Sequence, residues 1–287
     1  MATIMDGKAL AAEIDMRTAN RIQRLADQGI TPGLVVILVG KDPASQIYVR
    51  NKERRAKKLG IHSIVRNLPE TISEKELIKI IQEYNEDPTV HAILVQLPLP
   101  EQINEFHVTM AISPTKDVDG FNPFNLGKLL INKTDQTPIA CTPQGIMSFF
   151  KKYQINLDGK KAVMVGRSTI VGKPMAALLT NANATVTIAH SHTHHLSELT
   201  READILIVAI GVAHYIKAED VKPGAVVIDV GMDRDSNGKL VGDVDFESVE
   251  KKASYITPVP KGVGPMTITT LISQTVTMAE WSSEKNG

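Results

Sequence analysis

Tyr48 and Lys52 stand four positions apart in a stretch that reads as a helix, so their side chains share one face, about one turn apart. A tyrosine ring can stack on a flat substrate, and a partly buried lysine can exchange protons near neutral pH. The other reading is a solvated basic face, because further cations lie nearby: Arg50, Arg54, Arg55, Lys57 and Lys58. Short-chain dehydrogenases also use Tyr-x-x-x-Lys, but there the pair follows the nucleotide-binding glycines. Here it precedes them, so we reject that class.

Two aspartates flank Val118 in the turn Lys116–Phe121, which reads KDVDGF. Either carboxylate could stabilise the turn through Asx hydrogen bonds. Alternatively, Asp117 or Asp119 could grip a planar pair of N–H donors, as carboxylates do with guanidinium-like groups. The spacing does not decide between these two readings.

A glycine-rich turn follows a short apolar run at Ala162–Val165. Gly166 ends that run, and Gly172 and Pro174 open what reads as a helix. A strand, a tight turn and a helix N-terminus present free backbone N–H groups, which favour a bound anion such as a nucleotide phosphate. The spacing is G-x-S-x-x-x-G rather than G-x-G-x-x-G, and an ordinary strand-to-helix turn fits the same residues.

The run 190–195 reads HSHTHH. No cysteine lies near it, and i, i+2 and i+4 histidines on a loop make a poor zinc site, so no metal is predicted. The run follows the second strand of the second half, where NAD enzymes carry an acid for the ribose 2′-hydroxyl. Here the residues are Ala189, His190 and Ser191. An end without a carboxylate tolerates a 2′-phosphate, and together with Arg167 it favours NADP over NAD.

Alternating strands and helices position these residues in the first half. We predict helices at Met5–Gln28, 43–59 and Ser73–Asn85, and strands at Leu34–Val39, Ser63–Leu68 and Ala92–Gln96. Asp42 is expected to cap the second helix and Gly60 to end it. Continuous apolar strands in βαβ order indicate a parallel sheet buried on both faces. Gln96, Leu97 and Pro98 then fall at the carboxyl edge, where such sheets bind ligands.

The second half repeats the pattern. Strands are predicted at Ala162–Val165, Thr185–Ala189, Ile205–Ala209, Val226–Val230 and Tyr255–Thr257, with helices between them. The stretch 122–139 is poorly patterned, and the Pro/Gly-rich stretch Thr257–Thr267 is predicted to be irregular throughout. Ile268–Trp281 is long enough for a helix that docks back on the first half. We place the domain boundary near 140–147.

The composition describes a globular protein of about two domains, with 287 residues, 43% hydrophobic and 22% charged. Lys+Arg and Asp+Glu both number 32, so nothing calls for a nucleic acid or an anionic membrane as partner. A single cysteine, Cys141, excludes an intramolecular disulfide and suits a reducing cytoplasm. The first fifteen residues do not form a secretory signal, and no apolar run reaches the length of a membrane span.

Six motifs together match one known family in order and cover nearly the whole chain: Tyr48–Lys52 (YVRNK), Val95–Pro100 (VQLPLP), Lys116–Gly120 (KDVDG), Cys141–Pro143 (CTP), Gly166–Pro174 (GRSTIVGKP) and Gly262–Thr267 (GVGPMT). The chain resembles the bifunctional methylenetetrahydrofolate dehydrogenase/methenyltetrahydrofolate cyclohydrolase family of one-carbon metabolism. The resemblance implies an α/β fold of two domains with a cleft between them. One is a catalytic folate-binding domain at 1–140, completed by a returning helix at 268–287. The other is a Rossmann-like NADP-binding domain at 141–267.

The resemblance also implies the ligands, the partners and the residue roles. Substrates would be tetrahydrofolate derivatives, the cofactor NADP, and the assembly a cytoplasmic homodimer that serves purine, methionine and histidine biosynthesis. Lys52 would be the key group of the cyclohydrolase step, assisted by Gln96, while Tyr48 stacks near the folate and Asp119 holds the pterin. The implied cofactor contacts are Gly166, Arg167, Ser168 and Ser191, with Met232 at the nicotinamide end. The implied substrate side adds Leu97, Pro98, Pro260, Gly262 and Gly264.

Two positions depart from the family pattern. The family's last loop usually reads P-G-G-V-G-P, whereas here Lys261 replaces the first glycine. A side chain therefore stands where glycine lets backbone approach a ligand. His192 stands where many relatives carry a basic residue, which predicts a weaker or pH-dependent grip on a 2′-phosphate.

In the implied reaction, hydride leaves the methylene carbon of the substrate under the push of a nitrogen lone pair, which requires alignment rather than a base or a metal. Water then attacks the methenyl cation, and this step needs proton transfer, which we assign to Lys52 with Gln96. Two alternatives remain: a shikimate-type NADP dehydrogenase with the same domain order, and a non-catalytic NADP-responsive binding module. The joint presence of Tyr48, Lys52, Gln96 and Asp119 argues against the module.

Overall fold

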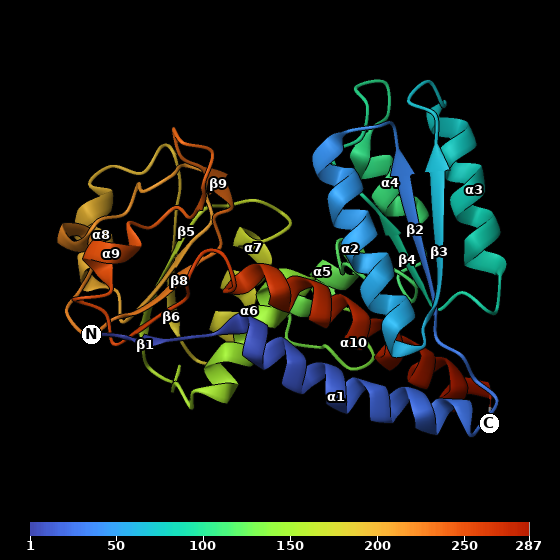
Figure 1. The fold of residues 1–287 in the computed structure, drawn as a ribbon, viewed down its shortest axis with the longest axis horizontal. Coiled ribbons are helices and arrows are strands. Elements are labelled where there is room, and N and C mark those ends of the chain that lie inside the picture. Colours follow the sequence, from blue (N-terminus) through green and yellow to red (C-terminus); the bar gives the residue numbers. More distant parts are fainter. Residues whose placement is uncertain (287) are drawn as a thin grey trace. The chain divides into compact units, whose positions relative to one another are not determined.

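The computed structural model describes residues 1–286, with side chains through 284, as two compact units (Figure 1). Unit 1 comprises Met1–Ala12 and Thr142–Thr267, and unit 2 comprises Glu13–Cys141 and Ile268–Gly287. From the sequence, we assigned residues 1–12 to the folate-binding domain, most of which is unit 2. They lie in unit 1 because the strand β1 (Thr3–Ile4) pairs in parallel with β11 (Tyr255–Ile256).

Unit 2 is built on a three-stranded parallel sheet in the order β3-β2-β4, formed by His62–Leu68, Gly33–Val39 and Ala92–Val95. Every residue of the central strand β2 is buried. Alternate side chains serve two cores. On one face of the sheet, Leu34, Val36 and Leu38 pack with α1 (Gly7–Ala26), α2 (Pro43–Leu59) and α10 (Val263–Asn286). The intervening residues pack on the other face with α3 (Glu74–Glu86) and α4 (Glu105–Ala111). Helices therefore cover both faces, and polar side chains are left to the strand ends.

The helices of unit 2 begin and end as their caps require. Asp42 accepts a hydrogen bond from Ser45 N (2.7 Å) before α2 (Pro43–Leu59), and Gly60 ends the helix at φ 91°. Ser73 forms a capping box with Glu76 at the start of α3 (Glu74–Glu86). Both of these helices were predicted to within a residue.

Two short helices were not predicted from the sequence, and the second of them lies in the poorly patterned stretch 122–139. These are α4 (Glu105–Ala111), capped by Asn104, and α5 (Pro123–Leu130), capped by Asn122. Phe124 and Leu130 of α5 are exposed, so this helix lacks the apolar face that would have revealed it. The asparagine caps and the proline in the first turn were the available signals.

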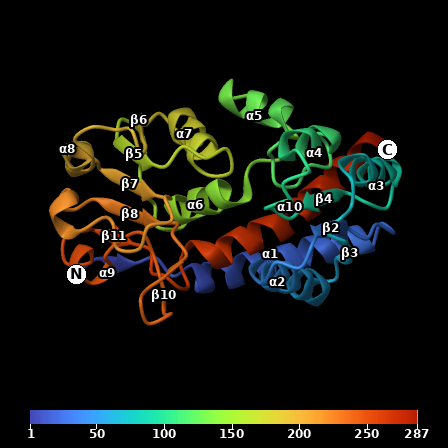
Figure 2. The same ribbon diagram turned by 90° about the horizontal axis from the view of Figure 1, so that it is seen from above.

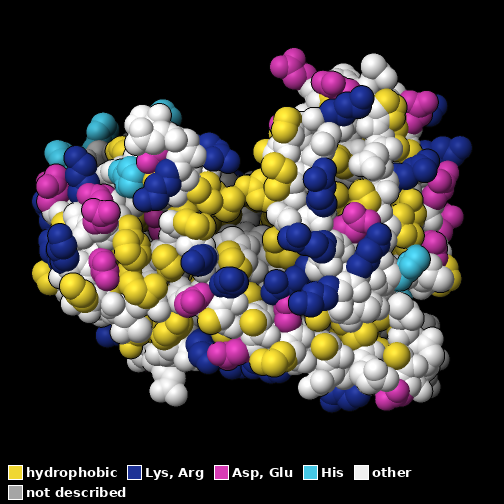
Figure 3. Space-filling view, in the orientation of Figure 1, with side chains coloured by type: hydrophobic (Ala, Val, Ile, Leu, Met, Phe, Trp, Pro, Cys, Tyr) yellow, Lys and Arg dark blue, Asp and Glu magenta, His cyan; other side chains and the backbone are white. Residues whose placement is uncertain are grey.

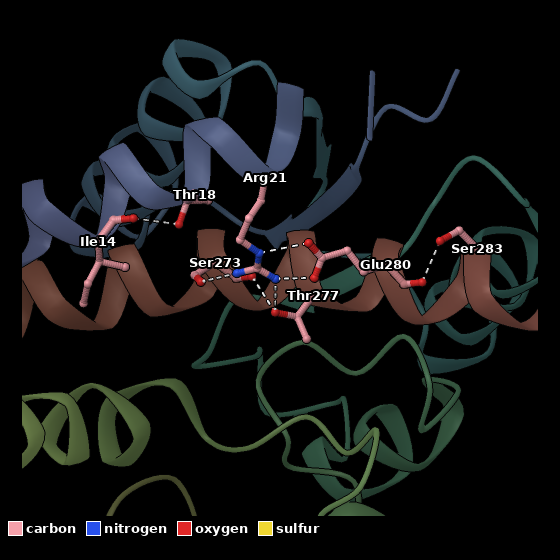
Figure 4. Close-up of polar contacts among 7 residues, drawn as sticks. All are labelled: Ile14, Thr18, Arg21, Ser273, Thr277, Glu280 and Ser283. Atoms are coloured by element: carbon pink, nitrogen blue, oxygen red, sulfur yellow. Dashed lines mark hydrogen bonds and ion pairs between the residues drawn. The ribbon is translucent and has the colours of Figure 1, made fainter. Parts of the chain in front are cut away.

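Two long helices, α1 (Gly7–Ala26) and α10 (Val263–Asn286), contribute residues to both units. Within unit 2 they are joined by the guanidinium of Arg21, which donates to Glu280, to Ser273 (3.1 Å) and to Thr277 (2.6 Å) (Figure 4). A planar guanidinium that binds a carboxylate through two N–H groups fixes the register of one helix on the other.

The predicted irregular stretch Thr257–Thr267 is wrong in its second half, because α10 already begins at Val263. The prediction rested on the proline and glycine content of the stretch, which includes Pro265. Pro265 lies in the first turn of α10, where a backbone N–H has no intrahelical acceptor to lose. The helix also runs past the predicted end at Trp281 to Asn286.

Unit 1 contains a six-stranded parallel sheet in the order β1-β11-β8-β7-β5-β6. The central strands are β5 (Lys161–Val165), β6 (Thr185–Ala189), β7 (Ile205–Val208) and β8 (Val226–Asp229). The helices α6 (Cys141–Lys152) and α7 (Gly172–Asn181) cover one face, and α8 (Leu196–Glu202) and α9 (Phe246–Val249) cover the other (Figure 2). A 3₁₀ turn, η1 (Ala218–Asp220), and a hairpin of β9 (Asp233–Arg234) with β10 (Leu240–Val241) complete the unit.

The contact of Arg21 with α10 predicts a measurable stability difference. Arg21→Met should lower the free energy of unfolding by about 1–3 kcal/mol, because it leaves Glu280 without its charge-assisted, partly buried partner. The matched control is Lys57→Met, which breaks the more exposed i,i+4 pair with Glu53 and should change stability little. Urea unfolding of both variants measures the difference, and equal losses would contradict the prediction.

Candidate functional site

Lys52 and Gln96 meet at the carboxyl end of the unit 2 sheet. Lys52 Nζ donates to Gln96 Oε1 over 3.1 Å, and Gln96 Nε2 donates to Leu97 O over 2.7 Å. The second hydrogen bond turns the amide so that its oxygen faces the lysine. Gln96 directly follows β4, so the sheet fixes the amide while α2 supplies the lysine. The two residues that the sequence paired from a distance are therefore in contact.

Asp119 lies with this pair. Burial raises the pKa of its carboxyl group, and the nearby Lys52 charge and a hydrogen bond with the Cys141 thiol oppose that rise. Tyr48 lies on α2 one turn before Lys52, with 38% of its surface exposed. The structure thus brings Lys52, Gln96 and Asp119 together, with an accessible ring on the same helix. An ammonium, an amide and a carboxylate can between them hold a planar polar ligand and move a proton.

The two aspartates of the KDVDGF turn have separate roles. The Asp117 carboxylate is buried and accepts hydrogen bonds from Asn122 N (2.7 Å) and Asn125 Nδ2 (3.0 Å). Burial raises its pKa to about 6. Asp117 is therefore the turn-stabilising residue, and Asp119 lies near the charge of Lys52.

The basic residues of α2 divide between structure and site. Lys and Arg side chains gather over the α2 side of unit 2 (Figure 3). Arg55 forms an ion pair with Asp15 at 2.5 Å and Lys57 pairs with Glu53 at 2.6 Å, whereas Arg54 and Lys58 are exposed. The solvated-face reading therefore fits part of this helix, and Lys52 is the cation that turns to the strand end.

The glycine turn of unit 1 is shaped by close backbone approaches. Gly166 has φ 127°, and a Cβ there would lie 2.4 Å from Ala209 O. A Cβ on Gly172 would lie 2.4 Å from Gly166 O. Ser168 Oγ accepts from Val171 N (3.1 Å) and Gly172 N (3.3 Å) at the start of α7. The spacing G-x-S-x-x-x-G thus has a local cause, since both glycines make room for backbone and the serine hydroxyl accepts from backbone N–H groups at the start of α7.

Polar side chains cluster where β5 and β6 end. Val165 pairs with Ala189, so Arg167 and the run that begins at His190 leave the sheet at the same edge. The pKa of His190 is lowered by burial and then by the nearby charges of Arg167 and His192. His190 Nδ1 accepts from His192 N over 3.2 Å, and Ser191 between them is exposed. Among residues 1–286, no group of three or more His, Cys, Asp or Glu is arranged to hold a metal.

Met232 and the last Pro/Gly loop also lie in unit 1. Met232 is 44% exposed, and a Cβ on Gly264 would lie 3.4 Å from its sulfur. Pro260 is exposed, and a Cβ on Gly262 would lie 2.3 Å from Pro258 O. Lys261 adopts φ 85°, so the lysine occupies the left-handed conformation that glycine would take without strain.

Sequence reasoning missed two buried carboxylates in unit 1. Asp243 is fully buried and accepts from Ile210 N (2.8 Å) and Val212 N (2.7 Å), which holds the loop after β7. Asp229 accepts from Gly231 N (2.9 Å) and from the backbone of residues 243 and 244, which holds the loop after β8. An aspartate at the end of an apolar run was the available signal, because a buried acid must find donors.

These contacts define an α/β protein of two units, one with a lysine–amide–carboxylate site at its strand ends and one with a doubly wound sheet suited to a dinucleotide. The chain matches the tetrahydrofolate dehydrogenase/cyclohydrolase catalytic domain over residues 5–119 and the NAD(P)-binding domain of the same name over 140–283. It belongs to the tetrahydrofolate dehydrogenase/cyclohydrolase family. The family and the two-domain α/β fold predicted from the sequence are thereby confirmed.

Relatives and solved structures agree with this assignment. The "Bifunctional protein FolD" of Pediococcus pentosaceus is 66% identical over 282 residues, which cover 98% of this chain and 100% of the relative. The crystal structure of the bifunctional FolD enzyme from Campylobacter jejuni has a TM-score of 0.96 and 48% identity and covers 98% of this chain and 99% of its own. A FolD structure from Trypanosoma brucei, complexed with NADP cofactor and inhibitor, has a TM-score of 0.94 and 37% identity and covers 98% of both chains.

The buried Asp229 predicts how the stability of unit 1 depends on pH. Burial raises the pKa of this carboxyl to about 7, from about 4 in an unfolded chain. Between these values the folded form retains a proton that the unfolded form releases. Asp229 therefore makes the free energy of unfolding fall as pH rises from about 4 to about 7, by up to about 1.4 kcal/mol per pH unit.

Asp229→Asn tests this contribution, because the amide does not titrate. The difference in unfolding free energy between wild type and variant should change steadily between about pH 5 and about pH 7, as followed by circular dichroism in urea. Asp158→Asn, at an exposed aspartate of the same unit, is the control and should run parallel to wild type. Parallel curves for Asp229→Asn would contradict the prediction.

Proposed function

We propose that this chain oxidises 5,10-methylenetetrahydrofolate to 5,10-methenyltetrahydrofolate with NADP and then hydrolyses that product to 10-formyltetrahydrofolate. The observation that carries the proposal is the contact of Lys52 with Gln96 beside Asp119, in a chain of the tetrahydrofolate dehydrogenase/cyclohydrolase family. The relatives' names as bifunctional enzymes support both activities. A non-catalytic module would not need this cluster, and the relatives named as bifunctional enzymes favour the folate reaction over a shikimate-type one.

Unit 1 has the features that an NADP site requires. Gly166 and Gly172 leave cradles that a Cβ would fill, next to the N-terminus of α7. Exposed Arg167 offers a fork of donors for a phosphate, and the strand end at Ala189 carries no acid that would repel one. Ser168 and Ser191 add hydroxyls, and Met232 would border the nicotinamide. When bound, NADP accepts the hydride, while the chain's own residues orient the partners and exclude water.

Unit 2 supplies the groups for substrate binding and hydrolysis. The Asp119 carboxylate would accept hydrogen bonds from paired N–H groups of the pterin, and the exposed ring of Tyr48 would stack on it. Lys52 Nζ, directed by Gln96 Oε1, would accept the proton that water loses as its oxygen bonds to the methenyl carbon. Leu97 and Pro98 would line the same edge. Pro260, Gly262 and Gly264 belong to unit 1, and the family resemblance alone supports them as further substrate contacts.

The location, the assembly and the pathways of the protein are inferred from its family. In the described part of the chain, no helix is long and apolar enough to cross a membrane. We propose a cytoplasmic homodimer that serves purine, methionine and histidine biosynthesis through its one-carbon product. The family resemblance supports these assignments.

Lys52→Met tests the two steps separately. Cyclohydrolase activity should fall by at least about 100-fold, because the acid–base group is lost, while NADPH formation from methylenetetrahydrofolate is retained. Lys58→Met, at an exposed lysine of the same helix, is the matched control and should keep both activities. Full cyclohydrolase activity in folded Lys52→Met would refute the role of the lysine. NADPH formation from shikimate but not from the folate would refute the substrate class.

Arg167→Ala tests the cofactor preference. The Michaelis constant for NADP should rise by about 10- to 100-fold, because a charge-assisted contact with the 2′-phosphate is lost, while that for NAD changes little. Arg201→Ala, at an exposed arginine of α8, serves as the control. An equal rise in the Michaelis constants for NADP and NAD would show that Arg167 does not bind the 2′-phosphate.

A further inference from the structure

Gln274, on α10, uses its whole side-chain amide to join two separate stretches of unit 2. Its Nε2 donates to Val118 O (2.5 Å) and to Ile139 O (2.9 Å), and its Oε1 accepts from Ile139 N (3.2 Å). These three hydrogen bonds go to backbone groups that belong to no strand or helix. A side chain here takes the place of a missing strand neighbour.

The two joined stretches carry the groups that surround the Asp119 carboxylate. Val118 directly precedes Asp119, and Ile139 stands two positions before Cys141, whose thiol contacts both Val118 O (3.4 Å) and Asp119. Between the stretches, Gly120 has φ 65°, and a Cβ there would lie 2.8 Å from Ala140 N. The backbone of the KDVDGF turn therefore lies directly against residues 138–140.

Asp119 consequently stands between two anchors. On one side, Asp117 is fixed by Asn122 N and Asn125 Nδ2. On the other side, the carbonyl of Val118 is fixed by Gln274. Loss of the second anchor would free the peptide unit between Val118 and Asp119 to rotate, and the carboxylate would move with it relative to Lys52.

We propose that Gln274 is a positioning residue that sets the orientation of Asp119 toward the pterin of the substrate, an inference that rests on the folate function proposed above. It lies on a helix that contains none of the catalytic groups, and it acts through the backbone of Val118 rather than through the substrate. The recognition geometry of unit 2 is thus set in part by α10.

Kinetics separates positioning from general support. A purely structural loss would reduce the amount of folded enzyme and so lower the rate for every substrate without a change in Michaelis constant. A displaced Asp119 raises the Michaelis constant for the folate while that for NADP stays the same. Gln274→Met removes these three hydrogen bonds, together with the longer contact of Nε2 with Cys141 Sγ (3.9 Å), at similar volume, and Gln274→Glu removes both donors.

The matched control is Thr277→Val, three residues further along α10. It removes two side-chain hydrogen bonds of α10 away from Asp119: that of Arg21 to Thr277, which lies between α1 and α10 (Figure 4), and that of Thr277 Oγ1 to Ser273 O (3.1 Å). We expect folded Gln274→Met to raise the Michaelis constant for methylenetetrahydrofolate about tenfold or more, with that for NADP within about twofold. Thr277→Val should leave both within about twofold. The proposal would be overturned if the Michaelis constant for methylenetetrahydrofolate were unchanged in Gln274→Met, or if it rose equally in Thr277→Val.

A double-mutant cycle tests whether Gln274 acts through Asp119. In an Asp119→Asn background, Gln274→Met should have little further effect on folate binding, because the group that it positions has been altered. Independent, multiplicative effects would overturn the proposal.

Hydrogen exchange provides a readout that does not depend on turnover. Amides of residues 118–122 should exchange faster in Gln274→Met than in wild type or Thr277→Val, and unchanged exchange would overturn the proposed anchor. Absence of folate turnover by the wild-type enzyme would instead refute the proposed function, so the two failures are distinguishable.

Discussion

Burial of the parallel strands on both faces is the constraint from which the site follows. Each residue of β2 is buried, and its side chains alternate between two apolar cores. A strand of this kind cannot carry a reactive group along its length, because an unpaired polar side chain there would be costly. Chemistry is therefore confined to the carboxyl ends, where the ladder stops and side chains reach solvent. Gln96 follows β4 for this reason, and Gly166 follows β5.

The same constraint creates a second requirement, because the loops that leave these strands have backbone groups without strand partners. Buried side chains satisfy them. Asp243 and Asp229 hold the loops after β7 and β8, and Asp117 holds the turn that carries Asp119. Burial makes the charged form of two of these acids less favourable. It raises the pKa of Asp229 to about 7 and that of Asp117 to about 6. The acids that order the loops are thus distinct from the acid that lies near the lysine.

The sequence predicted what depends on local chemistry and missed what depends on distant contacts. Apolar runs gave the main strands, and Asp42 and Gly60 marked the ends of α2 because caps act within a turn. The six sequence motifs identified the family. The strand β1 has two residues, too few to make a pattern, and exists through its pairing with β11. Pro265 misled because the cost of a proline depends on which turn of the helix it occupies. Asp117 and Asp119 could not be told apart from spacing, since their roles are decided by Asn125 and Lys52 from other parts of the chain.

Neither unit is a continuous piece of the chain, and this affects how the protein can be made. Thr3 pairs with Tyr255, and unit 2 is completed only by residues from 268 onward. During synthesis, the first strand of unit 1 must wait for its neighbour until most of the polypeptide has emerged. Unit 2 must likewise wait for α10, so its apolar β2 face stays uncovered in the meantime. Unit 1 is therefore completed only when residue 267 has been made, and unit 2 only after that, so a cut between residues 141 and 142 would leave neither half with all the residues of a unit.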